Sequence, residues 1–585
     1  MARIYFNCPL LKIANSERMM LRWILLVLML ALVLLAVLTL TNVIHISSTK
    51  TLDSINELHY GIVIDCGSSG SRIFVYYWPT HSGNPKDLLN VQQLLDSSGN
   101  AVVKKISPGL SSYEKTPDAA SDHIKELLLY AQNYIPKEKI PQTSLYVMAT
   151  AGMRMLASSA QQAILQDLRE DIGQTFQFIA PENHFEIISG KQEGVYAWIA
   201  INYALDRFSH GQREEDQLKA LDSMPSSPGD HQLKTTVGII DMGGASIQIA
   251  FEITDQAIVK DIPASLLSEF NLGCQDSDED HKYNIYVTTF LGYGANAARK
   301  TYETMLLQKH SSESSSTKPE PIQDVCLPTG MLYDVQSESG HLHKFLGQGD
   351  YEACQSALEP LMNLTAACSQ SPCSLNGIYQ PKIDLSGEFY GFSEFWYSTE
   401  DVFNIGGPYD YQRFHDKAKE FCKTHWITIQ DRFKKHFYPK ADDARIELQC
   451  FKSAWMTQIF HKGFSFPTSY SQFTSAQLVN GKDVGWTLGA LIYKTRFLPL
   501  RDIERLEENH LNQMTSSWQK VSRAIDASYL LSGCFLIVLA AIFVYMKRLK
   551  CCPRTELPRV ASMSYFMTEP DQMEQGLTKN HSYSL

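Results

Sequence analysis

Two segments of this chain repeat the same residue types at the same spacing. Residues 61–71 read GIVIDCGSSGS and residues 238–246 read GIIDMGGAS, so that two aspartates, Asp65 and Asp241, lie 176 residues apart. Each segment is an apolar strand followed by a turn of small residues, and a second apolar strand follows the turn. Such a turn lets backbone N–H groups approach a phosphate closely, and an aspartate at the strand end can hold a metal ion or its waters. The pair predicts a site that binds phosphates together with a cation.

Two other segments could complete a hydrolytic site, because hydrolysis of a phosphoanhydride also needs a base that orients water. Residues 188–198 (ISGKQEGVYAW) open an amphipathic helix, in which Ser189 and Gln192 have the spacing of a capping box. Glu193 then lies in the first turn as a candidate base, although a glutamate there can simply complement the helix dipole. We expect that dipole to lower the pKa of Glu193. Residues 146–154 (YVMATAGMR) form another strand that ends in small polar residues, or an ordinary strand-to-helix turn.

The elements around these segments alternate between strand and helix patterns, which predicts an α/β fold. The matched hairpins predict two actin-like (RNase H-like) lobes with the active site in the cleft between them. Sugar kinases share that layout, so a kinase remains an alternative, as does an inactive nucleotide sensor or adhesion protein. Residues 292–297 (GYGANA) resemble a dinucleotide-binding turn, but no second strand ending in an acidic residue follows.

Composition narrows the class of protein. The 585 residues include 52 Lys+Arg and 63 Asp+Glu, for a net charge of −11, and 44% of the residues are hydrophobic. That composition excludes a wholly disordered chain, and the acidic balance without a long basic run argues against a nucleic-acid binder. Length alone suggests about four domains, which the duplicated hairpin reduces to two large lobes.

Two long stretches, 23–45 and 527–546, contain no charged residue. Each is long enough to cross a bilayer as a helix, although the first could be a signal peptide and the second a buried core helix. Residues 1–22 carry +3 and residues 547–585 carry +2, which places both termini in the cytosol. The body between the spans, with a net charge of −16, is then luminal or extracellular.

Cysteine usage fits an oxidising compartment, where disulfides persist. Eight of the 12 cysteines fall in the body, and seven of those lie between Cys274 and Cys450, so at least one is left unpaired. The sequon at Asn363 is a predicted glycosylation site.

Five segments together resemble, in order, the apyrase conserved regions of the ectonucleoside triphosphate diphosphohydrolases. The resemblance covers essentially the whole body. The segments SGKQEGVYAW, GFSEFW and RFLPLRD are most similar to the intracellular Golgi and lysosomal branch of that family. The five segments are 65–72 (DCGSSGSR), 149–154 (ATAGMR), 192–198 (QEGVYAW), 241–248 (DMGGASIQ) and 449–455 (QCFKSAW).

The resemblance implies a role for each matching residue. Glu193 would be the catalytic base, Ser246 and Gln248 would hold the attacking water, and Thr150 would help to position it. Asp65 and Asp241 would bind Ca²⁺ or Mg²⁺, largely through waters. The residues expected to contact phosphates are Ser68, Ser69, Gly70, Ser71, Arg72, Ala151, Gly243, Gly244 and Ala245. Many cell-surface members have His at position 70 and Thr at position 71, which leaves the choice between di- and triphosphates open.

The family also implies an aromatic segment that stacks on the nucleobase, and residues 389–397 resemble it. Most of these aromatics should be core, with Trp396 and Tyr397 as candidates for stacking, while Trp486 could serve the cleft or packing. The pairing implied by the family is Cys274–Cys326, Cys354–Cys373 and Cys422–Cys450, which leaves Cys368 over.

The resulting expectation is a luminal apyrase that is anchored by two transmembrane helices and clears UDP or GDP in the Golgi. The alternative is a lysosomal, endosomal or surface nucleotidase that acts on triphosphates. Its partners are the nucleotide and the membrane, and paired anchors allow homo-oligomers. The predicted organisation is an N-terminal tail 1–22, a span 23–45, a stalk 46–58, lobe I 59–185 completed by about 480–505, lobe II 186–479, a stalk 506–526, a span 527–546 and a C-terminal tail 547–585.

Overall fold

The computed structural model describes residues 58–81, 88–208, 235–273, 282–313, 320–337, 340–498 and 540. All of these except Ala540 belong to the first of two compact units, Met1–Arg505. No helix among the described residues is long and apolar enough to cross a membrane. The predicted tails, spans and second stalk lie outside the described ranges, apart from Ala540, as do the first stalk up to residue 57 and Cys274.

The first mixed sheet is built around the hairpin of β1 and β2, and β5 runs parallel to β1 on the other side. Its strand order is β3-β2-β1-β5-β6, with β4 also paired to β2. The strands are β1 (Leu58–Cys66), β2 (Ser71–Pro79), β3 (Gln92–Gln93), β4 (Val103–Ile106), β5 (Ser144–Ala149) and β6 (Phe185–Ile187).

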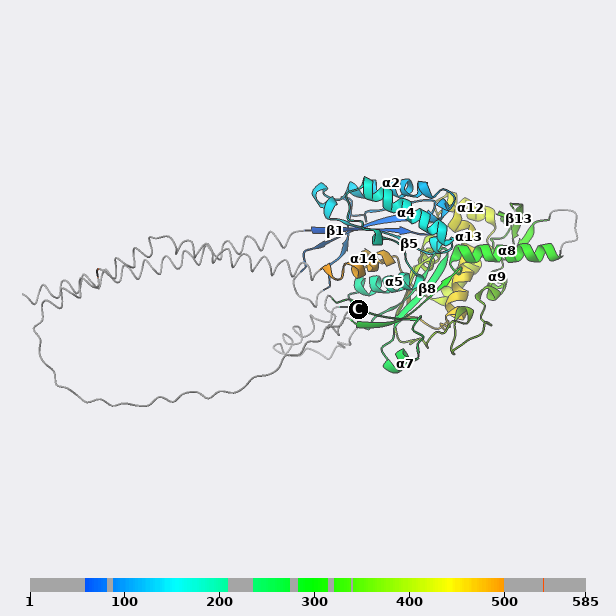
Figure 1. Cartoon of the computed structure of the whole chain (residues 1–585). Helices are drawn as coiled ribbons and strands as arrows, with labels where there is room; N and C mark the ends of the chain where they lie inside the picture. Colours follow the sequence, from blue (N-terminus) through cyan, green and yellow to red (C-terminus); the bar gives the residue numbers. More distant parts are fainter. Residues whose placement is uncertain are drawn as a thin grey trace, which may run out of the picture. The chain divides into compact units, whose positions relative to one another are not determined.

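The apolar run of β1 is buried on both faces of this sheet, as expected for a central strand covered on two sides. Ile62 and Ile64 pack with helices α2 (Ala120–Gln132) and α4 (Ser158–Thr175). Val63 points to the opposite face and belongs to a different core cluster. Figure 1 shows α2 and α4 covering the outer face of the first lobe, as we name this sheet and its helices.

The second mixed sheet repeats the arrangement of the first. The hairpin of β7 and β8 is antiparallel, β14 runs parallel to β7, and β16 runs parallel to β14. The strand order is β15-β16-β14-β7-β8-β10-β9. The strands are β7 (Gly238–Met242), β8 (Ser246–Glu252), β9 (Leu267–Asn271), β10 (Lys282–Leu291), β14 (Phe389–Ser393), β15 (Gly407–Pro408) and β16 (Phe473–Ser475). We call this sheet and its helices the second lobe.

Helices also cover both faces of the second sheet. On one face, Ile240 and Met242 share a core with α8 (Ala295–Glu313), α9 (Tyr351–Leu358) and α13 (Asp443–Gln458). The other face shares a core with the first lobe. The elements α5 (Gly190–Ala204) and α14 (Trp486–Thr495) contribute to that shared core together with Val63 of β1 and Ile239 of β7. The two lobes are therefore joined through α5 and α14, which carry Glu193 and Trp486 (Figure 1).

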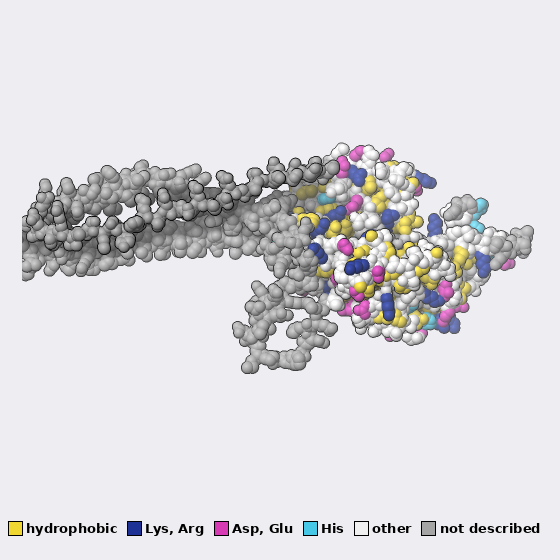
Figure 2. Space-filling view, turned by 60° about the horizontal axis from the view of Figure 1, so that its bottom comes forward, with side chains coloured by type: hydrophobic (Ala, Val, Ile, Leu, Met, Phe, Trp, Pro, Cys, Tyr) yellow, Lys and Arg dark blue, Asp and Glu magenta, His cyan; other side chains and the backbone are white. Residues whose placement is uncertain are grey.

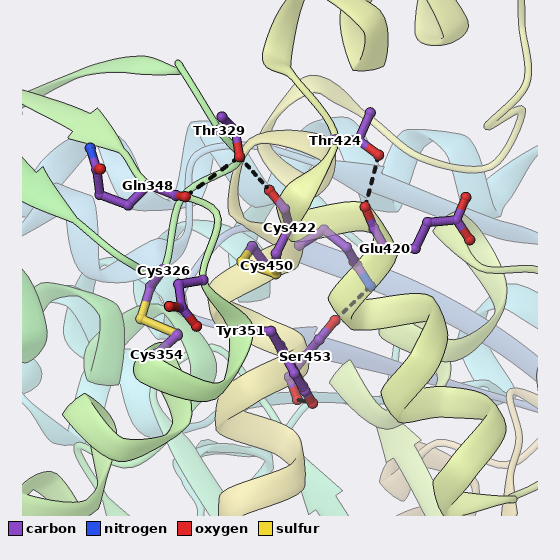
Figure 3. Close-up of a disulfide and its surroundings, with 12 residues drawn as sticks. Cys326, Thr329, Gln348, Tyr351, Cys354, Glu420, Cys422, Thr424, Cys450 and Ser453 are labelled. Atoms are coloured by element: carbon purple, nitrogen blue, oxygen red, sulfur yellow. Dashed lines mark hydrogen bonds between the residues drawn. A yellow bond between two sulfur atoms is a disulfide. The ribbon is translucent and has the colours of Figure 1, made fainter.

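Three disulfides link six of the seven described cysteines, with Cys66 buried as a free thiol, and two of the expected pairings are wrong. Cys422–Cys450 is present as predicted, but Cys326 bonds to Cys354 (Figure 3). Cys368 bonds to Cys373. Helix α9 brings Cys354 to a Cα–Cα distance of 4.9 Å from Cys326. Cys368, expected to be left over, lies five residues from Cys373 in one loop, with the Cα atoms 6.0 Å apart. The approach of Cys354 to Cys326 is created by tertiary packing, whereas Cys368 and Cys373 meet within one loop.

The surface of the described lobes carries both signs of charge. On the face shown in Figure 2, Lys and Arg side chains are interspersed with Asp and Glu rather than gathered in one patch. Asn363 is exposed, and its Nδ2 donates to Asn376 Oδ1 at 2.6 Å. Its glycosylation stays a prediction.

Candidate active site

The two hairpin tips are built alike. In the first lobe the N–H of Gly67 donates to the carbonyl of Gly70 at 3.0 Å, and in the second the N–H of Gly243 donates to the carbonyl of Ser246, also at 3.0 Å. The strand registers match as well, because Asp65 pairs with Arg72 and Asp241 pairs with Gln248. The duplication expected from the sequence is therefore present in three dimensions.

Both tips line one cavity of about 290 Å³. They approach each other so closely that a Cβ on Gly244 would lie 2.7 Å from Ser68 Oγ. A side chain at position 244 would force the Ser68 hydroxyl to turn away from its position in the cleft, so glycine suits this close approach. The expected site residues that line the cavity are Asp65, Ser68, Ser69, Arg72, Thr150, Ala151, Glu193, Asp241, Gly243, Gly244, Ala245, Ser246, Trp396 and Tyr397.

Three residues expected at the site lie behind that surface. The side chain of Ser71 is fully buried, and neither Gly70 nor Ser71 lines the cavity. Gln248 is also buried, but its amide reaches two residues that do line the cavity, Glu193 and Ser246. The first turn therefore presents Ser68 and Ser69 to a ligand, while Gly70 and Ser71 shape the turn.

Glu193 is the centre of a hydrogen-bonded group drawn from three elements. Its Oε2 accepts from Arg154 Nη2 at 2.9 Å and from Gln248 Nε2 at 3.0 Å. Ser246 Oγ accepts from the same two nitrogens, at 3.1 Å from Arg154 and 2.8 Å from Gln248. A further bond runs from Arg154 Nη1 to the carbonyl of Ile188 at 2.9 Å. The helix α3 (Ala151–Arg154), helix α5 and strand β8 thus meet at one carboxylate.

The predicted capping box fixes where α5 begins. Ser189 Oγ accepts from the N–H of Gln192 at 3.1 Å, and Gln192 Oε1 accepts from the N–H of Ser189 at 2.9 Å. Glu193 follows directly, buried in the first turn. Burial raises the pKa of Glu193 to about 7, with Arg154 opposing the rise and Asp241 and Asp65 adding to it. The expectation of a lowered pKa is therefore wrong, because loss of hydration outweighs the helix dipole.

The two hairpin aspartates are suited to a hard divalent cation. Oδ1 of Asp65 and Oδ1 of Asp241 are buried and have no hydrogen-bond partner among the described residues. Burial raises the pKa of Asp65 to about 6, with Arg72 lowering it and Asp241 raising it further. Burial also raises the pKa of Asp241. The described ranges hold no group of three or more His, Cys, Asp and Glu that could bind a metal.

Thr150 and Ala151 stand where β5 passes into α3. The N–H of Thr150 donates to the carbonyl of Cys66 at 3.2 Å, which ties this turn to the end of β1. Both residues are nearly buried, at 5% and 4% exposure, yet line the cavity. They are held beside the first hairpin tip.

The aromatic segment is only partly available to a base. Phe395 is fully buried, whereas Trp396 and Tyr397 line the cavity. The guanidinium of Arg445 lies 4.2 Å from the ring centre of Tyr397, so that face of the ring is covered. A base would stack on Arg445 or displace it. Trp486 lines the cavity, yet only 6% of its surface is exposed, so it both borders the cleft and packs in the core.

The segment 292–297 serves the second hairpin rather than a dinucleotide. Its N–H groups at Ala295 and Asn296 donate to the carbonyls of Gly243 and Gly244, at 3.0 and 2.9 Å. These two carbonyl oxygens, which would repel a phosphate, are therefore occupied by hydrogen bonds within the protein. Asn296 also lines the cavity, a position that the loop's glycine spacing did not reveal.

Several other cavity residues were not anticipated. Lys452 Nζ lies 3.1 Å from Glu394 Oε2, in a buried ion pair on the cavity wall. Asp483 is a further carboxylate of the cavity, and its Oδ1 accepts from the N–H of Gly485 at 3.0 Å. Arg154 and Lys452 lie inside two of the motifs described above, so the sequence indicated that both belong near the site. It did not indicate their ion-pair partners, because each partner comes from a distant part of the sequence.

Comparison with known proteins defines the class to which this fold and site belong. Residues 51–514 match the GDA1/CD39 (nucleoside phosphatase) family, so the chain belongs to that family. The chain is 46% identical over 538 residues to ectonucleoside triphosphate diphosphohydrolase 7 of Xenopus tropicalis, covering 90% of this chain and 86% of that protein. It is 44% identical to ectonucleoside triphosphate diphosphohydrolase 4 of Mus musculus, covering 91% and 87%. Nucleoside-diphosphatase mig-23 of Caenorhabditis elegans is 39% identical, with 79% and 82% covered. The prediction of a nucleoside phosphate hydrolase, with relatives among these diphosphohydrolases, is confirmed.

Proposed function

We propose that this protein hydrolyses nucleoside diphosphates, nucleoside triphosphates or both to nucleoside monophosphate and orthophosphate, with UDP and GDP favoured. The observation that carries the proposal is the meeting of Glu193 with the two hairpin aspartates in one cavity. Family membership supports the reaction, and the names of the similar proteins include both a triphosphate diphosphohydrolase and a nucleoside-diphosphatase. We interpret the two lobes as actin-like, since each repeats a hairpin flanked by parallel strands.

The reaction would be a direct attack of water on the terminal phosphorus. Glu193 takes a proton from a water that Ser246 and Gln248 help to hold, and the water oxygen bonds to phosphorus. The bridging P–O bond breaks, its electron pair leaves with the nucleoside phosphate, and orthophosphate is released. A pKa of about 7 leaves Glu193 partly ionised at neutral pH and basic enough to accept the proton. Thr150 and Ala151 would position the terminal phosphate against this group.

A divalent cation fits the same cavity. Asp65 and Asp241 would hold Ca²⁺ or Mg²⁺, largely through waters, at their two unpartnered oxygens. A bound cation would supply positive charge to neutralise the phosphate oxygens. The tip residues Ser68, Ser69 and Gly243 would contact the remaining phosphate oxygens from the two sides of the cleft.

The setting that fits the sequence is the lumen of the Golgi, with the protein anchored by the stretches 23–45 and 527–546 and both termini in the cytosol. The three disulfides in the described part suit an oxidising compartment. There the enzyme would convert UDP or GDP released by glycosyltransferases to the monophosphate. The alternative is a lysosomal, endosomal or surface nucleotidase that prefers triphosphates.

A panel of substrates tests this proposal. Orthophosphate release by the purified full-length protein would be measured with UDP, GDP, ADP, UTP and ATP, each with Ca²⁺, with Mg²⁺ and with EDTA. We expect rapid release from UDP and GDP with a cation and almost none with EDTA. Faster hydrolysis of triphosphates would favour the alternative, and release that is unaffected by EDTA would contradict the role of the two aspartates.

A further inference from the structure

One lysine of the cavity has no role in the account above. Lys105 lies on β4 directly opposite Arg72 on β2, and both side chains line the cavity. The Cε of Lys105 lies 3.2 Å from the place where a Cβ on Gly70 would stand, so the lysine passes beside the first hairpin tip. It remains exposed to solvent. Lys105 therefore stands at the open side of the cavity, next to the turn that would contact phosphates.

The other basic residues in and beside the cavity interact with acidic groups. Lys452 pairs with Glu394 at 3.1 Å on the cavity wall, and Arg154, which stands behind that wall, pairs with Glu193 at 2.9 Å. Arg445 pairs with Asp401. Arg72 is buried, but the neighbouring Tyr397, Asp65 and Asp483 raise its pKa. Within the described part of the chain, Lys105 Nζ makes no ion pair and no hydrogen bond.

An unpaired lysine opposite an arginine needs an explanation, because like charges facing each other across two strands are destabilising. Burial, Arg72 and Arg445 lower the pKa of Lys105, while Asp442 and Asp65 act against that effect. An anion bound beside Lys105 and Arg72 would relieve the repulsion between them and favour the charged lysine. The arrangement is therefore better suited to the complex with an anion than to the empty protein.

The neighbours of Lys105 indicate which part of the anion it would meet. Arg72, directly opposite Lys105, forms a side-chain hydrogen bond with Tyr397 of the aromatic segment. Arg445, whose guanidinium covers the ring of Tyr397, is also among the charges that act on Lys105. Asp65 acts on both Lys105 and Glu193, but the hydrogen bonds of Glu193 go to Arg154 and Gln248. Lys105 thus stands beside the aromatic end of the cavity.

We propose that Lys105 binds the phosphate that remains attached to the nucleoside when the bridging P–O bond breaks. The inference rests on the proposed nucleotide hydrolysis and names a residue that binds substrate and product without taking part in the chemical step. Lys105 holds the nucleoside monophosphate after orthophosphate has formed, and it strengthens binding of the intact substrate through the same phosphate.

The test uses Lys105→Met with Lys104→Met as the matched control. Lys104 is the adjacent residue of β4, but it pairs with Glu126 at 2.7 Å and lies 5.6 Å from the ring centre of Tyr130, and it does not line the cavity. Binding of UMP to the full-length protein would be measured by titration calorimetry, and inhibition of UDP hydrolysis by UMP and by orthophosphate would be measured separately.

For Lys105→Met we expect the Kd and Ki of UMP and the KM of UDP to rise about tenfold, which is the loss of one charge-assisted hydrogen bond. We expect kcat and the Ki of orthophosphate to stay within about twofold of the parent, and Lys105→Arg to recover most of the UMP affinity. Unchanged UMP binding would overturn the proposal, as would an equal effect of Lys104→Met or a matching rise in the Ki of orthophosphate. Because calorimetry needs no turnover, failure of the proposed hydrolysis would be seen separately, as absent phosphate release by the parent.

Discussion

Arg154 offers a sharp perturbation of the proposed base. Its Nη2 lies 2.9 Å from Glu193 Oε2, and its Nη1 donates to the carbonyl of Ile188. The pKa of Glu193 is raised to about 7 by burial even though Arg154 opposes that rise. An Arg154→Met variant keeps a long apolar side chain and removes the positive charge. The pKa of Glu193 should therefore rise further.

The size of this change follows from the short separation of the pair. An opposite charge this near lowers the pKa of a carboxyl group by about 1 to 3 units, so the variant should move Glu193 from about 7 to about 8 to 10. Glu193 acts as a base only when ionised, so activity is present above its pKa and lost below it. At pH 7 the ionised fraction should fall from about one half to about a tenth or less, and kcat/KM should fall about fivefold or more.

The assay is kcat/KM for UDP between about pH 5.5 and 10 for the parent, Arg154→Met and Arg154→Lys. We expect the acid limb of the Arg154→Met profile to shift to higher pH by at least about one unit, with activity recovering at the alkaline end. Arg154→Lys keeps the charge and should shift less. A profile for Arg154→Met that is lower at every pH, with its acid limb in the parent's position, would refute this account of the Glu193 pKa.

Three further predictions concern stability. Asp65→Asn should stabilise the cation-free protein at pH 8 by about 2 to 3 kcal/mol in urea unfolding, because the folded pKa of Asp65 is raised from 3.8 to about 6. That gain should vanish below about pH 3, where aspartate is protonated in both states, and the variant should lose the stabilisation by Ca²⁺ that we expect for the parent. Ser189→Ala removes the capping box of α5 and should lower the unfolding free energy by about 1 kcal/mol, whereas no loss would show that packing alone fixes the helix start. Cys422→Ser with Cys450→Ser should cost about 2 to 5 kcal/mol by the same measurement, and an unchanged midpoint would mean that this bridge contributes nothing.

The sequence predicted local features of this site well. The hairpin around Asp65 and its repeat around Asp241 depend on strand patterns and small turn residues, and the capping box that places Glu193 depends on two residues three apart. Each is encoded within about a dozen residues. The α/β class and the central β1–β2 and β7–β8 hairpins follow from the same local patterns.

What the sequence could not predict depends on contacts between distant segments. Arg154 meets Glu193 only because α3 and α5 converge, and the raised pKa of Glu193 follows from burial that its helix position does not reveal. The covering of Tyr397 by Arg445 joins two helical segments 48 residues apart in the sequence. The disulfide pairing implied by the family resemblance was correct only for Cys422–Cys450, because Cys354 is brought to Cys326, 28 residues away, by the packing of α9.

The central claim is that Glu193 activates water for attack on a nucleotide phosphate. Phosphate release from UDP with Ca²⁺, compared between the parent and Glu193→Gln, tests it most directly, with UMP binding as the check that the cavity is intact. We predict that kcat falls by about 10² to 10⁴-fold while the Kd of UMP changes little. A Glu193→Gln protein that releases phosphate as fast as the parent would contradict the claim.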